Sequence, residues 1–115
     1  MARSRAQISR RKKYGNVRTR IDNFTFDSKL EARRYGELKL LEKAGEIHDL
    51  EIHPRYPLDV NGTRVCTYVA DFVYRDTRGT LHVEDVKGMR TALFILKKKL
   101  MHAVWGIEVE EVKAG

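Results

Sequence analysis

The sequence that decides the fold reads YVADFVY over residues 68–74 and VEDVKG over residues 83–88. In the first stretch, apolar residues flank Asp71 on both sides, which is typical of a strand that is buried on both faces of a sheet. A carboxylate in such a strand carries a large free-energy cost unless it is paired or binds a cation. Asp71 is therefore a candidate functional residue.

The second stretch places Asp85 and Lys87 two residues apart, so strand alternation points both side chains to one face. Neighbouring strands lie about 4.8 Å apart, which brings Asp71 and Asp85 within reach of one ion. Two close carboxylates repel each other unless a cation lies between them, and hard oxygen ligands favour Mg²⁺. Lys87 would supply positive charge to an attacking water or a scissile phosphate. The alternative is an Asp–Lys ion pair on an exposed strand face.

The rest of the chain alternates between helical and extended patterns. Ser28 and Glu31 form an S-x-x-E capping box, which predicts a helix that Gly45 ends. Pro54 and Pro57 predict a bend in an edge strand. We expect extended segments over residues 17–26, 47–60, 65–74, 81–87 and 107–112, a hairpin turn at 61–62, and a second helix over 91–105. The order of helix, three strands, helix and strand predicts a mixed α/β fold around a small sheet.

The first helix carries charged residues within its apolar face. Leu30, Leu38 and Leu41 define this face at 100° per residue, and both Glu31 and Arg34 fall on it. Glu31 either caps the helix or turns a carboxylate toward the core, where it would need a partner or a cation. Arg34 is more typical of an ion-paired or snorkelling side chain.

The second helix shows the same anomaly at Lys97. This residue falls inside an apolar stripe, so its ammonium either snorkels past its neighbours or reaches a phosphate or carboxylates at the sheet edge. The stripe consists of Leu93, Phe94, Leu96, Leu100, Met101 and Val104.

Positive charge is concentrated at the N-terminal end. The net charge is +7, and residues 1–20 hold eight Lys or Arg and no acid, while the other 95 residues hold 15 basic and 16 acidic residues. We expect a mobile arm that binds nucleic acid through its phosphates, although charge alone does not separate DNA from RNA. A solvated tail without a function is the alternative. The candidate nucleic-acid-binding residues are Arg10, Arg11, Lys12, Lys13, Arg18, Arg20 and Lys97.

Other features narrow the class of protein. Cys66 is the only cysteine, which excludes an intrachain disulfide and fits a reducing cytoplasm. We expect no membrane span and no secretory signal, because no apolar run is long enough and none follows the basic N-terminus. No glycine-rich phosphate loop is present, so no nucleotide cofactor is expected. The histidines lack metal-binding spacing, and we interpret them as ordinary surface or core residues: His48, His53, His82 and His102.

Taken in order, these residues resemble the PD-(D/E)XK nuclease superfamily. Asp71, thirteen intervening residues and then Asp85 and Lys87 match its bipartite motif, and the helix that begins SKLE resembles its leading glutamate helix. The resemblance covers residues 24–112. Ala70 replaces the proline of the motif, and Asp85 stands where a glutamate is common. Glu84 beside it leaves the second metal ligand open, although alternation favours Asp85.

The resemblance implies a restriction-endonuclease-like core and a magnesium site, with Mn²⁺ as a substitute. Asp71, Asp85 and the Val86 carbonyl would hold the metal, and Glu31 would complete or flank its shell. Lys87 would orient the water and stabilise the pentacoordinate phosphate. The catalytic residues would therefore be Glu31, Asp71, Asp85 and Lys87, and the products a 5′-phosphate and a 3′-hydroxyl.

Within the superfamily, FDSKLEA over residues 26–32 and VEDVKG resemble small phage-encoded endonucleases likened to Holliday-junction resolvases. This implies a nuclease domain over residues 21–115 that works as a homodimer on branched DNA in phage DNA processing, in the cytoplasm of a bacterial host. Two alternatives stay open. One is a non-catalytic nucleic-acid-binding module with a basic arm, and the other is a nicking or end-processing nuclease.

Overall fold

The computed structural model describes residues 18–87 and 89–113, which form a mixed α/β fold. Its strands are, in chain order, β1 (Thr19–Ile21), β2 (Phe24–Phe26), β3 (Ile47–Ile52), β4 (Arg55–Val60), β5 (Thr63–Val69), β6 (Phe72–Asp76), β7 (Leu81–Lys87) and β8 (Glu110–Lys113). Its helices are α2 (Lys29–Lys43) and α3 (Ala92–Trp105). The central sheet has the order β3-β6-β7-β8 and is mixed, because β7 and β8 are parallel and the other pairs are antiparallel. The predicted α/β class, with a mixed sheet and two helices, is confirmed, whereas five strands and not three lie between the two helices.

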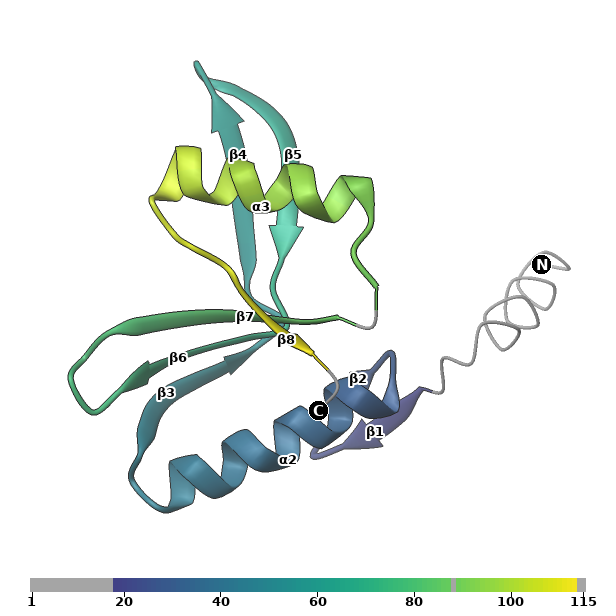
Figure 1. The fold of residues 1–115 in the computed structure, drawn as a ribbon, viewed down its shortest axis with the longest axis vertical. Coiled ribbons are helices and arrows are strands. Elements are labelled where there is room, and N and C mark those ends of the chain that lie inside the picture. Colours follow the sequence, from purple (N-terminus) through teal and green to yellow (C-terminus); the bar gives the residue numbers. More distant parts are fainter. Residues whose placement is uncertain (1–17, 88, 114–115) are drawn as a thin grey trace, which may run out of the picture.

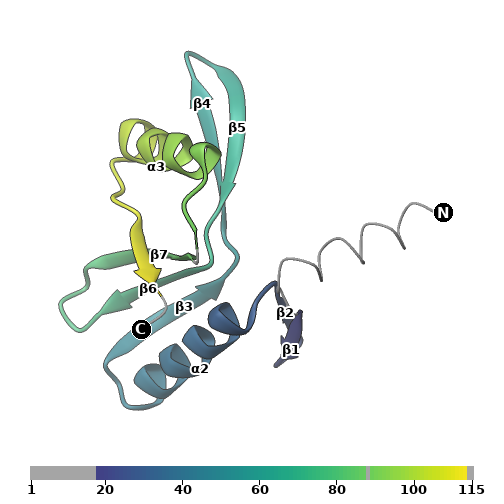
Figure 2. The same ribbon diagram turned by 45° about the vertical axis from the view of Figure 1, so that its right-hand side comes forward.

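Two of the predicted strands are interrupted. The extended segment over residues 47–60 consists of β3 and β4, and the segment over 65–74 consists of β5 and β6. β3 and β6 belong to the central sheet, whereas β4 and β5 form a separate hairpin that leaves the sheet and carries α3 (Figures 1 and 2). The prediction that Asp71 lies within one continuous strand was wrong, because it lies in the bend between β5 and β6.

The two interruptions face each other and remain hydrogen bonded. Pro54 has no backbone N–H to donate, and His53 before it has a positive φ of 56°, so β3 cannot continue as a regular strand. The His53 N–H donates to the Asp71 carbonyl at 3.0 Å, and the Ala70 N–H donates to the Pro54 carbonyl at 3.1 Å. The ribbon therefore bends as a unit. We call these four residues, His53, Pro54, Ala70 and Asp71, the paired bend.

The alternation of side chains along β6 and β7 divides the core into two clusters. One lies toward α2 and contains Phe26, Ala32, Tyr35, Leu38, Ile47, Phe72 and Tyr74. The other lies toward α3 and contains Leu58, Tyr68, Ala70, Val73, Val83, Phe94, Met101 and Val109. We refer to the two sides of the central sheet as the α2 face and the α3 face.

The predicted start of the first helix is confirmed, but its buried face is shifted. The Glu31 N–H donates to the Ser28 Oγ at 3.1 Å, which is the capping bond expected at this end. The buried residues of α2 are Glu31, Ala32, Tyr35 and Leu38, whereas Leu41 is exposed and Leu30 is half-buried. The buried face of α2 is therefore rotated around the helix axis relative to the predicted face, which contained Leu30, Leu38 and Leu41.

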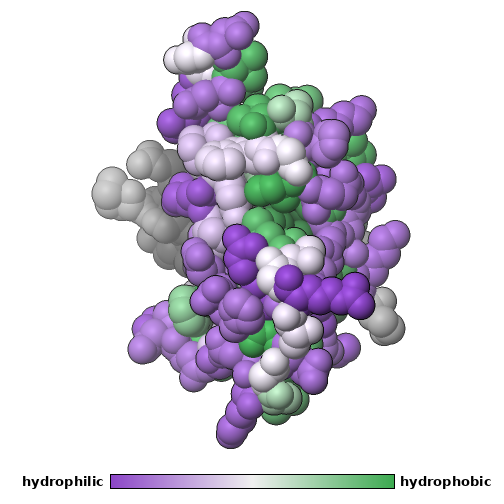
Figure 3. Space-filling model, turned by 90° about the vertical axis from the view of Figure 1, so that its left-hand side faces the viewer, coloured by the Kyte–Doolittle hydropathy of each residue, from purple (hydrophilic) through white to green (hydrophobic). Residues whose placement is uncertain are grey.

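The apolar stripe predicted for the second helix is also only partly buried. α3 buries Phe94 and Met101, while Leu93, Leu96 and Val104 are exposed. The reason is the narrow support, because α3 packs on a two-stranded hairpin instead of a wide sheet. Hydrophobic side chains accordingly reach the surface on the face in Figure 3, in its upper part where α3 and the hairpin lie. Among the described residues, no helix has the length and apolar character that crossing a membrane requires.

His82 joins three strands on the α2 face. Its Nε2 lies 2.8 Å from Asp76 Oδ2 at the end of β6, and its Nδ1 lies 2.6 Å from Glu110 Oε2 on β8. The ring stacks on Tyr74 with centroids 5.1 Å apart. The hydrogen bond to Asp76 raises the pKa of His82 and outweighs the opposing effect of burial. His82 therefore acts as an imidazolium clamp between two carboxylates.

This clamp predicts a pH-dependent stability. The stabilisation by the His82 imidazolium is fully present below the unfolded-state pKa of 6.5 and is lost as the pH rises through the higher folded-state pKa. In urea denaturation at a series of pH values, we expect wild type to lose stability above pH 6.5 relative to His82→Gln. His102→Gln, at an exposed position of α3, is the control and should keep the wild-type profile. Parallel profiles for wild type and His82→Gln would contradict the clamp.

Candidate functional site

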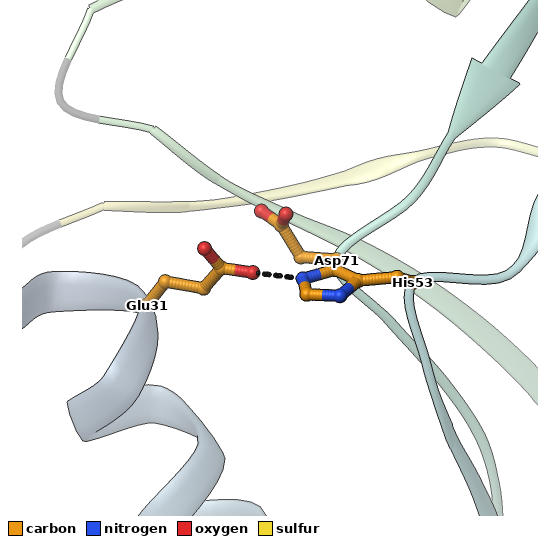
Figure 4. Close-up of side chains that lie close together, drawn as sticks. All are labelled: Glu31, His53 and Asp71. Carbon is orange, nitrogen blue, oxygen red and sulfur yellow. Dashed lines mark hydrogen bonds and ion pairs between the residues drawn. The ribbon is translucent and has the colours of Figure 1, made fainter. Parts of the chain in front are cut away.

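The candidate site lies at the paired bend, beside the first turn of α2. Glu31 comes from α2, His53 from the end of β3, and Asp71 from the break between β5 and β6 (Figure 4). Each offers one ligand atom, and these atoms all lie within 4.8 Å of one another. Three separate elements thus bring two carboxylates and one imidazole together, and we call this group the acid–histidine cluster.

Glu31 serves both roles that the sequence left open. Its side chain is buried, with a residue exposure of 6%. Its Oε1 accepts from the Asp27 N–H at 3.2 Å, just before the helix, and its Oε2 lies 2.7 Å from His53 Nε2. One oxygen therefore helps to cap α2 while the other faces the cluster.

The Asp71 side chain replaces a backbone hydrogen bond that β6 would otherwise make with β7. Its Oδ2 accepts from the Val86 N–H at 2.7 Å, at the level where β6 has already bent away from β7. Burial, the charge of Glu31 and the charge of Asp85, in that order, raise the pKa of Asp71 to about 8. Negative charge at this point is thus poorly compensated, which is the electrostatic condition that a bound cation relieves.

Asp85 and Lys87 lie on the α3 face, next to this cluster. The Tyr68 hydroxyl donates to Asp85 Oδ2 at 2.6 Å, and Lys87 Nζ lies 3.1 Å from Asp85 Oδ1. Lys87 Nζ also lies 4.2 Å from the centroid of the Phe94 ring of α3. The Asp–Lys ion pair named as an alternative is present, but Asp85 is buried and the pair does not lie on an exposed strand face. That Asp71 and Asp85 share one ion stays a prediction.

Glu84 lies on the opposite face from Asp85. Its carboxylate is almost fully buried and accepts from Arg34 Nε at 2.8 Å and Arg34 Nη2 at 2.6 Å, and also from the Tyr74 hydroxyl. Arg34 is thus an ion-paired side chain. Because Glu84 is turned toward α2 and Lys87 toward α3, the geometry favours Asp85 over Glu84 as the partner of Lys87.

The remaining candidate residues have different surroundings. Lys97 Nζ donates to the Thr67 carbonyl at 3.0 Å, which ties α3 to β5 and leaves its contact with a phosphate a prediction. Arg18 Nε lies 3.7 Å from Asp27 Oδ1, and Arg20 is exposed on β1. Val86 contributes its N–H to Asp71. The other basic residues of the expected arm lie outside the described residues: Arg10, Arg11, Lys12 and Lys13.

His53 is the member of the cluster that sequence reasoning missed. It was interpreted as an ordinary histidine, because its partners are 22 and 18 residues away and no short spacing joins them. The available signal was its position before Pro54, where a strand has to bend. A histidine at a strand break that faces a half-buried aspartate is a more specific pattern than histidine spacing alone.

The comparisons with known proteins give a family but no activity. A family model described as "Protein of unknown function (DUF1064)" matches residues 11–113. No curated protein and no solved structure matches the chain. The function therefore has to be argued from the geometry of the site.

The ion pair between Arg34 and Glu84 on the α2 face predicts a loss of stability when Arg34 is replaced. Arg34→Met would leave the Glu84 carboxylate buried without its cation, so we expect the free energy of unfolding to fall by about 3 kcal/mol in urea denaturation. Adding Glu84→Gln removes the uncompensated charge and should recover part of this loss. Arg33→Met, at the exposed neighbouring position, is the control and should change stability by about 0.5 kcal/mol or less. An unchanged free energy of unfolding in Arg34→Met would show that the buried Glu84 carboxylate does not depend on this ion pair.

Proposed function

The chain belongs to the DUF1064 family, and we propose that it is a metal-dependent DNA endonuclease of the PD-(D/E)XK type, which hydrolyses phosphodiester bonds. The observation that carries the proposal is the convergence of Glu31, His53 and Asp71 within 4.8 Å, beside the Asp85–Lys87 pair. A module that only binds nucleic acid has no need of buried carboxylates that repel each other. The convergence therefore favours an enzyme.

The topology supports the restriction-endonuclease-like core. When each bent ribbon arm is counted as one strand, the chain runs α2, β3–β4, β5–β6, β7, α3 and β8. This is the order of helix, three strands, helix and strand that the resemblance implies. Asp71, at the bend, lies beside the level of β7 that holds Asp85, since the Asp71 N–H donates to the Glu84 carbonyl at 3.1 Å.

The residues at the bend fit a divalent cation. Glu31 and Asp71 offer carboxylate oxygens, and the raised pKa of Asp71 marks a place where positive charge is missing. Glu31 and Asp71 would hold Mg²⁺, or Mn²⁺ as a substitute, together with Asp85 and the Val86 carbonyl. A cation bound there would stabilise charge on the phosphate and lower the pKa of a bound water.

The chain's own residues would provide positioning and charge. Tyr68 holds Asp85 through its hydroxyl, and Asp85 in turn holds the Lys87 ammonium against the face of the Phe94 ring. An ammonium fixed in this way would stabilise the negative charge that develops on the phosphate in the transition state. The products would be a 5′-phosphate and a 3′-hydroxyl.

Substrate form and assembly follow from the same proposal. A single small domain offers one active site, so symmetric cutting of a branched DNA requires two copies, most simply a homodimer with two-fold symmetry. The basic residues of the N-terminal segment would bind the DNA backbone through its phosphates. We therefore propose branched DNA, as processed by phages, as the substrate, and a homodimer as the active form.

The first test of the proposal is Asp71→Asn. A bound cation stabilises the folded state by mass action, so Mg²⁺ and Mn²⁺ should raise the melting temperature of wild type. The variant should stay folded, because an amide oxygen still accepts the Val86 N–H, but it should lose both the metal-dependent shift and the cleavage of labelled branched DNA. Asp49→Asn, at an exposed position, should retain both. Cleavage at the wild-type rate by Asp71→Asn would remove this residue from the mechanism.

The second test separates binding from chemistry at Lys87. Lys87→Ala removes one charge among many, so the affinity for DNA should stay close to wild type. Its cleavage rate should fall by about 10²–10³-fold, as is typical when a contact to the transition state is lost. Lys99→Ala, at an exposed position of α3, is the matched control and should cut normally. A parallel loss of affinity and cleavage would make Lys87 a docking contact.

A further inference from the structure

His53 is held in place from several directions. Its backbone N–H donates to the Asp71 carbonyl at 3.0 Å, and its ring lies against Phe26 with centroids 5.8 Å apart. Its Nε2 lies 2.7 Å from Glu31 Oε2. His53 is thus held through its backbone N–H, by the tilted contact of its ring with Phe26 and at Nε2, and this nitrogen is the atom that points into the acid–histidine cluster (Figure 4).

The contact is not one that a histidine makes by chance with a neighbouring acid. His48 shows such a chance contact, with its Nδ1 3.1 Å from the carboxylate of the adjacent Asp49, where both side chains are exposed. At His53 the partner comes from another element, is buried, and lies beside a second, half-buried carboxylate. His48 therefore serves as an internal comparison for His53.

The spacing of the cluster matches that of ligands around one ion. Neighbouring ligands of an octahedral ion at about 2.1 Å lie about 3 Å apart, and opposite ligands about 4.2 Å apart. The three ligand atoms lie within 4.8 Å of one another, and the closest pair given, His53 Nε2 and Glu31 Oε2, is 2.7 Å apart. Both values are close to the separations of ligands around one ion, so the cluster has the size that one ion requires.

We infer that His53 Nε2 is a metal ligand together with Glu31 and Asp71, and that this nitrogen makes the centre select a first-row transition-metal ion such as Mn²⁺ over Mg²⁺. The inference rests on the proposed function and names the cation that the same site prefers. Mg²⁺ prefers oxygen ligands and keeps much of its water, whereas imidazole is a better ligand for transition-metal ions. A purely carboxylate site would not make this distinction as strongly.

The variant that tests the inference has to respect the backbone. The φ of 56° at His53 strains most residues, but asparagine tolerates it, so His53→Asn removes the imidazole without straining the bend. His48→Asn is the matched control. Isothermal titration of each protein with MnCl₂ and with MgCl₂ measures both affinities without any substrate.

We expect wild type and His48→Asn to bind Mn²⁺ at least about tenfold more tightly than Mg²⁺. In His53→Asn the affinity for Mn²⁺ should fall by about tenfold or more while the affinity for Mg²⁺ changes less, so the preference is lost. Pulsed electron paramagnetic resonance of bound Mn²⁺ gives a second readout. Coupling to an imidazole nitrogen should be present in wild type and in His48→Asn, and absent in His53→Asn.

The outcomes separate this inference from the proposed function. An unchanged Mn²⁺ to Mg²⁺ preference in His53→Asn, or the absence of nitrogen coupling in wild type, would overturn the ligand assignment while the Asp71→Asn test of the nuclease still stands. Absence of binding of either ion to wild type would overturn both. Loss of nitrogen coupling together with loss of the preference would support His53 as the ligand that selects the metal.

Discussion

The structure depends on the pair of backbone hydrogen bonds that crosses the paired bend, from His53 to Asp71 and from Ala70 to Pro54. These bonds keep two strands together where neither continues in the central sheet. Because the ribbon bends as a unit, β4 and β5 leave the sheet and provide the surface on which α3 packs. The same bend leaves the Val86 N–H of β7 without a regular strand partner, and the Asp71 carboxylate accepts it. One local interruption thus sets both the shape of the molecule and the position of its central carboxylate.

β7 carries one buried carboxylate on each face of the sheet, and each of the two is paired with a cationic side chain on the same face. On the α2 face, Glu84 has the Arg34 guanidinium, and on the α3 face, Asp85 has the Lys87 ammonium. Asp71 differs from both, because among residues 18–87 and 89–113 it has no ion pair with Lys or Arg; its Oδ2 accepts the neutral Val86 N–H, and its other side-chain contact is with the Glu31 carboxyl group. Its raised pKa is the consequence of burial beside Glu31 and Asp85. A cation is the simplest group that would compensate this charge.

Local features of the fold could be predicted from the sequence, whereas features that depend on pairing could not. The Ser28 cap of α2 and the turn at Asn61 and Gly62 are encoded within a few residues, and both were placed correctly, although the Glu31 carboxylate accepts from the Asp27 N–H. The break at Asp71 has no such local signal, because the β-branched and aromatic residues on both sides of Ala70 and Asp71 favour a strand, and the bend depends on the pairing with Pro54. His53 was missed for the same reason, since its role depends on residues from two other elements. The burial of α3 was overestimated because periodicity reports which face is apolar and not how wide its support is.

The bend also explains how residues from opposite faces of a sheet can serve one site. In a regular strand a side chain points to one face or the other, so Asp71 could approach either Glu31 near α2 or Asp85 near α3, but not both. At the break its carboxylate instead lies at the level of the backbone of β7, where it accepts the Val86 N–H. From there it is close enough to both acids for each of their charges to raise its pKa. An interruption of the strand, and not the strand itself, is therefore what allows Asp71 to connect the acid–histidine cluster with the Asp85–Lys87 pair.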